Sequence, residues 1–274
     1  MEWPVKELVS EGAASSDLAL VESLPKSTPR RYGHYTYVPA GEAESACGVG
    51  RGVFGIAVPT TGQTAVRMLF ILDRLGDACG TESDVPLTAV RVIHSERKLQ
   101  KLDFLIRNPD YLANVIISGW EEGRLSSDSL LDARTVLEER EPELHTYRML
   151  RGRHGAFEQL NNALSVLRHL ELIAIRRAGR VSDGRVQRRD YYLLDAGVAC
   201  AQELRTTEPQ LAWYDQQARY VLMAARGMSG GQLKALQYGH EEYASTPEGR
   251  IIGGITAKVR ERLDVALAQE GLAA

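Results

Sequence analysis

Cysteine is rare in this chain, with only Cys47, Cys79 and Cys200 among 274 residues. The three are far apart and odd in number, which fits neither a disulfide framework nor the paired C-x-x-C ligands of a zinc site, so we expect free thiols. No apolar run approaches the roughly 18 residues of a membrane-spanning helix. The N-terminus also lacks the basic stretch and apolar core of a secretory signal. These absences predict a cytoplasmic protein without a membrane contact.

A large net charge is also missing, since the formal charge is −3 at pH 7. This balance argues against a generally basic protein that coats nucleic acid. The charge is nevertheless segregated along the chain. Residues 121–143 hold eight acidic residues against three arginines (3 − 8 = −5), and residues 145–190 hold ten arginines against four acidic residues (10 − 4 = +6). A cationic segment therefore follows directly after an anionic one.

Complete catalytic motifs are lacking as well. Residues 227–231 fit the G-x-S-x-G pattern of hydrolases, but a helical pattern precedes Ser229 where a strand is required. His240 begins an H-E-x-x-H zinc pattern that fails at Ala244, and no G-x-x-x-x-G-K-S/T phosphate loop occurs. We therefore expect no enzymatic activity, no cofactor, no metal and no small-molecule substrate. Ser229 is interpreted as a helix cap, and a serine hydrolase that uses Ser229 is the weaker alternative.

The first 61 residues are interpreted as an irregular N-terminal arm. This stretch is rich in Pro, Gly, Ser and Ala and shows no sustained periodicity. Its aromatic residues are more numerous than a free linker requires, which favours an arm that becomes ordered on a partner protein. The expected anchors on that partner are Tyr32, Tyr35, Tyr37 and Phe54.

Three helices are predicted between residues 62 and 120. Thr64 is expected to cap the first. Pro86 is expected to open the second, which runs through Leu87 and Val90 and stops at Asn108, because the proline that follows disfavours a helical residue before it. Asn108 is then expected to cap a short buried helix.

The middle of the chain carries the strongest pattern. Apolar residues recur every three or four residues from Phe157 to Leu170, which predicts an amphipathic helix. Residues 172–177 and 186–194 read as strands on either side of an Asp-Gly turn at 183–184, which predicts a β-hairpin. Asp195 is expected to cap one more helix.

These elements predict a mainly α protein with a small β-hairpin. A winged-helix-like domain is expected over residues 62–206, interrupted by an acidic insertion at about residues 120–145. Residues 207–274 are predicted to add C-terminal helices, one of them opened by Ser229. For the last helix, residues 246–248 provide a start signal, but the Gly253-Gly254 pair that follows leaves a start near Thr256 as the alternative. The helical and strand spacings place five apolar residues in one core: Leu102, Leu105, Leu164, Leu167 and Ile173.

Arginines gather on and beside the expected hairpin. In winged helices that bind DNA, the wing meets the phosphate backbone, where cations give a salt-dependent affinity that ignores base sequence. A solvated face and a docking surface for an acidic protein are equally compatible with this composition. The candidate nucleic-acid-binding residues are Arg168, Arg176, Arg177, Arg180, Arg185, Arg188 and Arg189.

Three stretches carry a family resemblance: RVIHSERKLQKLDFLIRNPDYLA (91–113), HGAFEQLNNALSVLRHLELIAIRR (154–177) and SGGQLKALQYGHEEYAST (229–246). Together they resemble the middle component of bacterial ABC-three-component systems, in particular the accessory subunit of Lamassu-type anti-phage systems. The resemblance implies a non-catalytic subunit that bridges an SMC-like, Rad50-like ATPase and an effector, often a nuclease, in an antiviral defence complex. It implies no catalytic residue in this chain and leaves direct contact with double-stranded DNA open.

A stand-alone winged-helix transcription regulator is the main alternative. Such a regulator is a symmetric dimer that places two reading helices at half-site spacing on DNA. The predicted reading helix offers little for this role, since it is expected to expose Glu158, Asn161 and Ser165, and its positive charge is limited to Arg168.

Overall fold

The computed structural model describes residues 60–80, 85–138, 149–152, 155–178 and 188–272. The first elements are α2 (Thr61–Leu75), β1 (Asp77–Ala78), β2 (Ala89–His94), α3 (Glu96–Arg107), α4 (Pro109–Glu121) and α5 (Ser129–Glu138). The middle elements are β3 (Leu150–Gly152), β4 (Gly155–Phe157), α6 (Asn161–His169), β5 (Ile173–Ala178) and β6 (Arg188–Leu194). The last elements are α7 (Asp195–Thr207), the 3₁₀ turn η3 (Pro209–Leu211), α8 (Ala212–Ala225), α9 (Gly230–Tyr238), α10 (Glu241–Ala244) and α11 (Thr256–Gln269).

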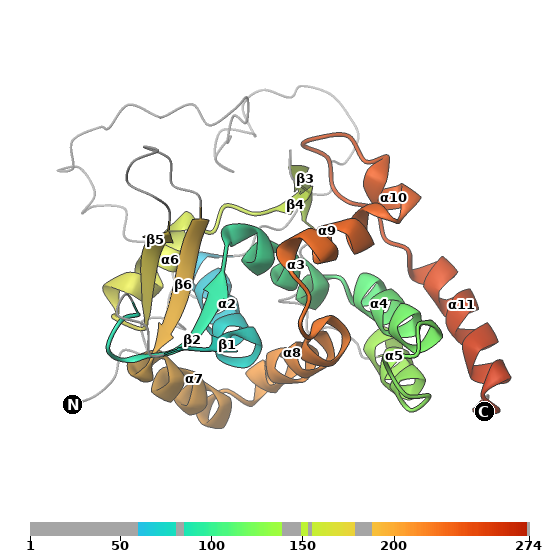
Figure 1. Cartoon of the computed structure of the whole chain (residues 1–274), viewed down its shortest axis with the longest axis horizontal. Helices are drawn as coiled ribbons and strands as arrows, with labels where there is room; N and C mark the ends of the chain where they lie inside the picture. Colours follow the sequence, from blue (N-terminus) through green and yellow to red (C-terminus); the bar gives the residue numbers. More distant parts are fainter. Residues whose placement is uncertain (1–59, 81–84, 139–148, 153–154, 179–187, 273–274) are drawn as a thin grey trace, which may run out of the picture.

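Helices predominate in the described ranges, and the strands form a four-stranded antiparallel sheet and a separate two-stranded one. The predicted class, mainly α with a small β component, is confirmed. Figure 1 shows the larger sheet at one end of the molecule, α4, α5 and α11 at the other end, and α3 between them.

The predicted β-hairpin is present as β5 and β6. The two strands pair antiparallel, from Ile173 opposite Leu193 to Ala178 opposite Arg188, and the predicted turn at residues 183–184 lies outside the described residues. β2 pairs with the other side of β6, and β1 pairs with β2. The sheet order is therefore β1-β2-β6-β5, with β5 at the edge.

The helix predicted to begin near Pro86 is wrong in its first half. Residues 89–94 form β2 instead, and α3 begins only after Ser95, whose side chain accepts a hydrogen bond from the Lys98 N–H. β2 is rich in β-branched residues, which favour a strand that has a partner. Because that partner is the distant β6, no local pattern revealed it. Leu87 is exposed rather than packed on a helix.

Two other helices begin elsewhere than predicted. Thr60, and not Thr64, caps α2, because Thr60 forms a reciprocal capping box with Gln63. α6 begins at Asn161, and Phe157 lies in β4, where it is exposed.

Two predicted caps act differently from the prediction. Asn108 stands at the start of α4, but its side-chain amide donates to the Phe104 carbonyl of the preceding helix at 2.7 Å and makes no cap hydrogen bond. Asp195 lies in the first turn of α7, one residue inside the helix. The predicted cap at Ser229 is confirmed at the start of α9, and of the two predicted starts of the last helix the one near Thr256 is confirmed, since α11 begins at Thr256.

One hydrophobic core runs through the described part of the chain. The five predicted core residues, Leu102, Leu105, Leu164, Leu167 and Ile173, are all buried in it, as predicted. Residues of α8, α9 and α11 belong to the same core, including Val221, Leu233 and Val259. The C-terminal helices therefore stabilise the same folded unit as the sheet.

The order of elements is compatible with a winged-helix core. α2, β2, α3, α6, β5 and β6 follow one another as helix, strand, helix, helix and hairpin, and β2 pairs with the second strand of that hairpin. α2 packs against both α3 and α6. Between α3 and α6 the chain inserts α4, α5, β3 and β4, and α11 packs against α4 and α5. The insertion is thus longer than the acidic segment predicted for residues 120–145.

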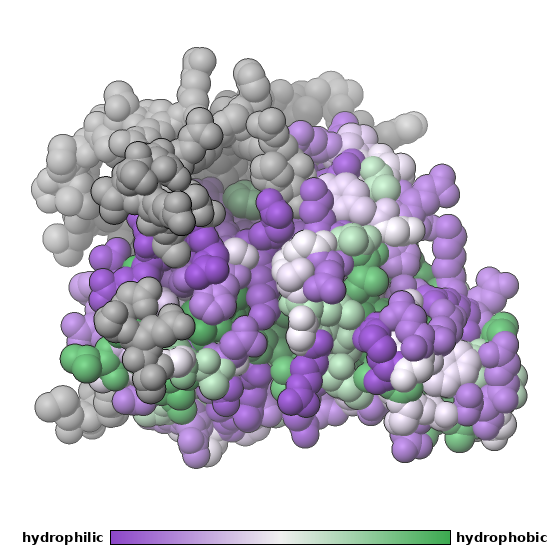
Figure 2. Space-filling view, in the orientation of Figure 1, coloured by the Kyte–Doolittle hydropathy of each residue, from purple (hydrophilic) through white to green (hydrophobic). Residues whose placement is uncertain are grey.

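Hydrophilic residues predominate on the coloured surface of the face drawn in Figure 2, with small apolar patches between them. The large apolar side chains that are exposed come from separate elements: Leu87, Val90, Leu131, Leu150, Phe157, Leu222 and Val265. Leu150 and Phe157 lie directly opposite one another in β3 and β4 and so share a face. Exposed apolar residues in such small numbers are ordinary on a protein surface.

Candidate nucleic-acid interface

The arginines of the hairpin form the first candidate site. Hairpin formation brings together residues from the two strands and from the helix that leads into them. Arg180 and Arg185 lie outside the described residues. The described members are Arg168 in the last turn of α6, Arg176 and Arg177 on β5, and Arg188 and Arg189 on β6.

The strand register divides these arginines between the two faces of the hairpin. Residues directly opposite one another in an antiparallel pair share a face. Arg177 lies opposite Arg189, on the face that carries core residues further along the strands, whereas Arg176 lies opposite Asp190 on the other face. Positive charge therefore surrounds the end of the hairpin instead of lining one side of it.

Some of these arginines have a carboxylate partner. Asp190 is buried, and its carboxylate accepts a hydrogen bond from Arg188 Nη2 at 2.9 Å and lies 3.2 Å from His94 Nδ1. Arg189 lies 3.7 Å from the Glu96 carboxylate at the start of α3. Within the described ranges, Arg176 and Arg177 have no ion-pair partner, and both are exposed.

α6 presents a polar surface next to the hairpin. Leu164 and Leu167 are buried against the core, as predicted. The exposed residues of α6 are mostly uncharged and polar, which provides hydrogen-bonding groups without a strong field of either sign. They are Asn161, Asn162, Ser165, Arg168 and His169.

Glu158 does not lie on that exposed face, contrary to the prediction. Its carboxylate is bound by Arg67 and Arg107. Arg67 Nε also donates to Asp103 at 2.5 Å, and these cationic side chains and Asp103 are almost fully buried. The network ties α2 and α3 to the segment before α6, and removing one member of such a buried pair costs about 3–5 kcal/mol. Sequence reasoning missed it because the partners lie on three separate elements.

Ser229 and His240, the residues of the hydrolase-like pattern, have structural partners. The Ser229 hydroxyl accepts from the Gln232 N–H at 3.2 Å in a capping box, which confirms the predicted helix cap. His240 Nε2 lies 3.0 Å from the Asn114 side-chain amide, and burial lowers the pKa of the imidazole. The hydrogen-bonding groups of both residues are thus engaged in holding helices in place.

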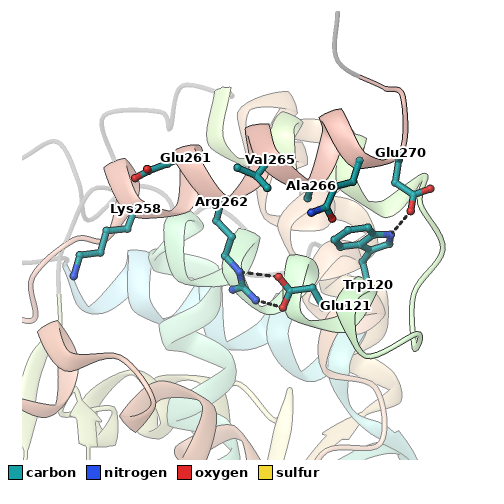
Figure 3. Close-up of a pocket in the computed structure, with 9 residues that line it drawn as sticks. Trp120, Glu121, Lys258, Glu261, Arg262, Val265, Ala266 and Glu270 are labelled. Carbon is teal, nitrogen blue, oxygen red and sulfur yellow. Dashed lines mark hydrogen bonds and ion pairs between the residues drawn. The ribbon is translucent and has the colours of Figure 1, made fainter.

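A groove runs between α4 and α11, as Figure 3 shows. Arg262 points from α11 across it to the Glu121 carboxylate on α4, and Trp120 Nε1 donates to Glu270 at 3.2 Å. Arg262 and Glu121 therefore neutralise one another, whereas the lining residue Lys258 pairs with Glu242 outside the groove. These contacts fasten the C-terminal helix to the insertion.

Other predicted features concern metals, thiols and the membrane. Cys79 and Cys200 are free thiols, whereas Cys47 and the four aromatic anchors of the arm lie outside the described residues. Across the described ranges, His, Cys, Asp and Glu side chains do not gather into a group that could hold a metal ion. None of the described helices combines the length and the apolar character needed to cross a bilayer.

Comparison with protein family models, with curated proteins and with solved structures yields no match to this chain.

Proposed function

We propose that this chain is a non-catalytic connector subunit of a cytoplasmic anti-phage complex. In this proposal its winged-helix-like core contacts the phosphate backbone of duplex DNA through the hairpin, while other surfaces hold an SMC-like ATPase and an effector. The observation that carries the DNA contact is the arginine-lined hairpin at the edge of the sheet. The assembly part rests on the family resemblance of residues 91–113, 154–177 and 229–246.

The like charges on the hairpin favour an anionic ligand. Arg177 stands directly opposite Arg189, and like charges in such a pair destabilise the strands. A phosphate group between or beside them would relieve this repulsion and release counterions from the nucleic acid. Arg176 and Arg177 have no carboxylate partner among the described residues, so a ligand need not displace one.

The same geometry favours binding that is independent of base sequence. Arginines that surround a hairpin can each meet a phosphate, and phosphate contacts position a protein without reading bases. α6 adds Asn161, Asn162 and Ser165, which can donate to phosphate oxygens but lack the charge of a strongly basic reading helix. A subunit that recruits an ATPase and an effector to DNA of any sequence requires this kind of contact.

Salt-dependent binding of two unrelated duplexes to the full chain tests the DNA contact. We expect the two duplexes to bind alike, and affinity to fall steeply as salt is raised from about 50 to 200 mM. The double variant Arg176→Glu/Arg177→Glu should bind more weakly and lose about one unit of the slope of log affinity against log salt for each phosphate contact removed.

The matched control is Arg219→Glu/Arg260→Glu, which makes the same change in net charge at exposed positions on α8 and α11. This control should retain the parental slope. Parental affinity in the hairpin variant at low salt would assign the arginines to a protein contact and contradict the DNA contact.

A further inference from the structure

We propose that the DNA-contacting surface extends beyond the hairpin, as a band of cations that crosses the N-terminal ends of α3 and α9 and reaches β3. Its ligand is the phosphate backbone of duplex nucleic acid, and the described residues that form the band are Arg176, Arg177, Arg188, Arg189, Arg97, Lys234 and Arg151. This inference rests on the proposed DNA contact and adds three residues that lie outside the hairpin.

The hairpin and the start of α3 are joined directly. The Ser95 N–H donates to the Arg189 carbonyl at 3.0 Å, and the Arg189 side chain lies 3.7 Å from Glu96. Arg97 follows in the first turn of α3 and is exposed. The end of the hairpin therefore leads straight onto the first turn of this helix.

α9 continues the band. Gly230, at the start of α9, packs so closely on α3 that a Cβ there would lie 3.0 Å from the Lys98 backbone nitrogen. Burial lowers the pKa of Lys101 beneath these helix starts, and the positive charges of Lys234, one helical turn later on α9, and of Arg97 lower it further. Figure 1 shows α9 crossing in front of α3. The first turns of two helices, whose dipoles favour anions, thus lie side by side.

Tyr238 connects α9 to the far end of the band. Lys234 Nζ lies 5.0 Å and the Arg151 guanidinium 5.5 Å from the centre of the Tyr238 ring, so a single aromatic side chain holds two cations near each other. Arg151 also donates to the Thr246 carbonyl. In the part of the chain that the structure describes, Arg97, Lys234 and Arg151 have no carboxylate partner.

A buried cation beneath the band provides an independent observation. Lys101 is 1% exposed, and the acceptor that the described residues offer its Nζ is the Ala156 carbonyl at 3.3 Å. Gly155 leaves room for it, because a Cβ at that position would lie 2.5 Å from Lys101 Nζ. The described residues place no carboxylate on this ammonium, whose burial is costly unless it is paired. An anionic backbone lying over Arg97 and Lys234 would add negative charge near it.

The acidic residues along this path do not cancel its charge. Glu96 lies beside Arg189, Asp77 accepts from Lys98 Nζ at 2.9 Å, and Asp190 is buried under Arg188. Each of these carboxylates faces its own cation. The cations left over lie on β5, α3, α9 and β3, elements that pack on one another through β6 and β4, and such a spread suits a long, uniformly charged polymer better than a small anion.

The test compares double variants of the full chain in the salt titration described above. Arg97→Glu/Lys234→Glu should weaken duplex binding and lose about one unit of slope for each phosphate contact removed. In the quadruple variant, which adds Arg176→Glu/Arg177→Glu, the loss of slope relative to the parent should equal the sum of the losses in the two double variants. Thermal melting verifies that each variant is folded. If Arg97→Glu/Lys234→Glu no longer melts cooperatively, Arg97→Gln/Lys234→Gln is used in its place.

The outcomes separate this inference from the proposed function. The band is supported if both double variants lose slope and the two losses add up in the quadruple variant. A parental slope in Arg97→Glu/Lys234→Glu, together with a loss in the hairpin variant, overturns the band and leaves the hairpin contact standing. Parental slopes in both double variants overturn the band and the proposed DNA contact together.

Discussion

At the scale of single residues, the protein contains two kinds of buried charge. The side chains of Arg67, Asp103, Arg107 and Glu158 neutralise one another inside the network between α2 and α3, so their burial is compensated. Lys101 has no carboxylate partner in the described ranges, and burial lowers its pKa to about 8. The first kind is balanced by its own partners, whereas the second is a destabilising feature of the kind that functional sites retain.

Lys101→Met should therefore stabilise the free protein at neutral pH. In the parent, the pKa of Lys101 is about 8 in the folded chain, against an ordinary 10.5. Between these values the unfolded chain holds a proton that the folded chain has lost, so the parent's free energy of unfolding rises with pH through this window. Below pH 8 the parent bears the full cost, on the order of 3 kcal/mol.

Denaturant unfolding at pH 7 and pH 9.5 measures this effect. The variant should be more stable than the parent at pH 7, and the difference should shrink at pH 9.5. Lys234→Met is the control, since Lys234 is only half-buried, and it should show a much smaller difference. A Lys101→Met protein that is less stable than the parent at pH 7 would mean that its ammonium has a compensating partner.

At the scale of helices and strands, the sequence predicted correctly the features that depend only on residues close together in the chain. The Asn-Pro boundary at Asn108, the cap at Ser229 and the 3.6-residue periodicity of α6 and α11 are decided within one or two turns of chain. β2 was missed because it is stabilised by pairing with β6, whose residues lie far along the chain. Short apolar runs such as residues 89–94 are ambiguous until the partner strand is known.

The candidate site shows the same limit of local patterns. The hairpin arginines could be proposed from the sequence because they are clustered in it. The residues proposed to extend the site, Arg97, Arg151 and Lys234, were not singled out because they lie on separate segments of the chain, and only the packing of α3, α9 and β3 brings them near one another. Glu158 was misplaced for the same reason, since its partners Arg67 and Arg107 lie on other helices.

α6 provides a direct test of the core that supports the hairpin. Leu164 is buried on the side of α6 that faces the core, so Leu164→Ala should lower the free energy of unfolding by about 2–5 kcal/mol, as other large core truncations do. Chemical denaturation measures the change. Ser165→Ala, on the exposed side of the same helix, should stay within about 0.5 kcal/mol of the parent. Equal stabilities for the two variants would contradict the packing of α6.

At the scale of the whole molecule, the segregation of charge suits oriented docking. An acidic stretch at residues 121–143 is followed by a cationic one at 145–190, and the fold places the cationic hairpin at the opposite end from α4 and α5 (Figure 1). Opposed charges of this kind orient partners and set association rates. In the proposed connector, the hairpin end would contact DNA and the end formed by α4 and α5 would contact another subunit.

The N-terminal arm is expected to hold one of the partners. In the proposal, Tyr32, Tyr35, Tyr37 and Phe54 are its anchors, because aromatic residues carry much of the binding energy in protein interfaces. Deleting residues 1–58 leaves every residue of the described core in place. The truncated chain should therefore melt cooperatively while losing at least one partner.

Co-purification of the tagged full chain with the products of its neighbouring genes tests the connector most directly. The proposal predicts one complex that contains an SMC-like ATPase and an effector, and loss of at least one of them when residues 1–58 are deleted. It also predicts that the purified chain alone neither hydrolyses ATP or esters nor cuts DNA. Recovery of the chain alone, retention of every partner at the parental ratio by the truncated chain, or turnover by the isolated chain would contradict the connector function.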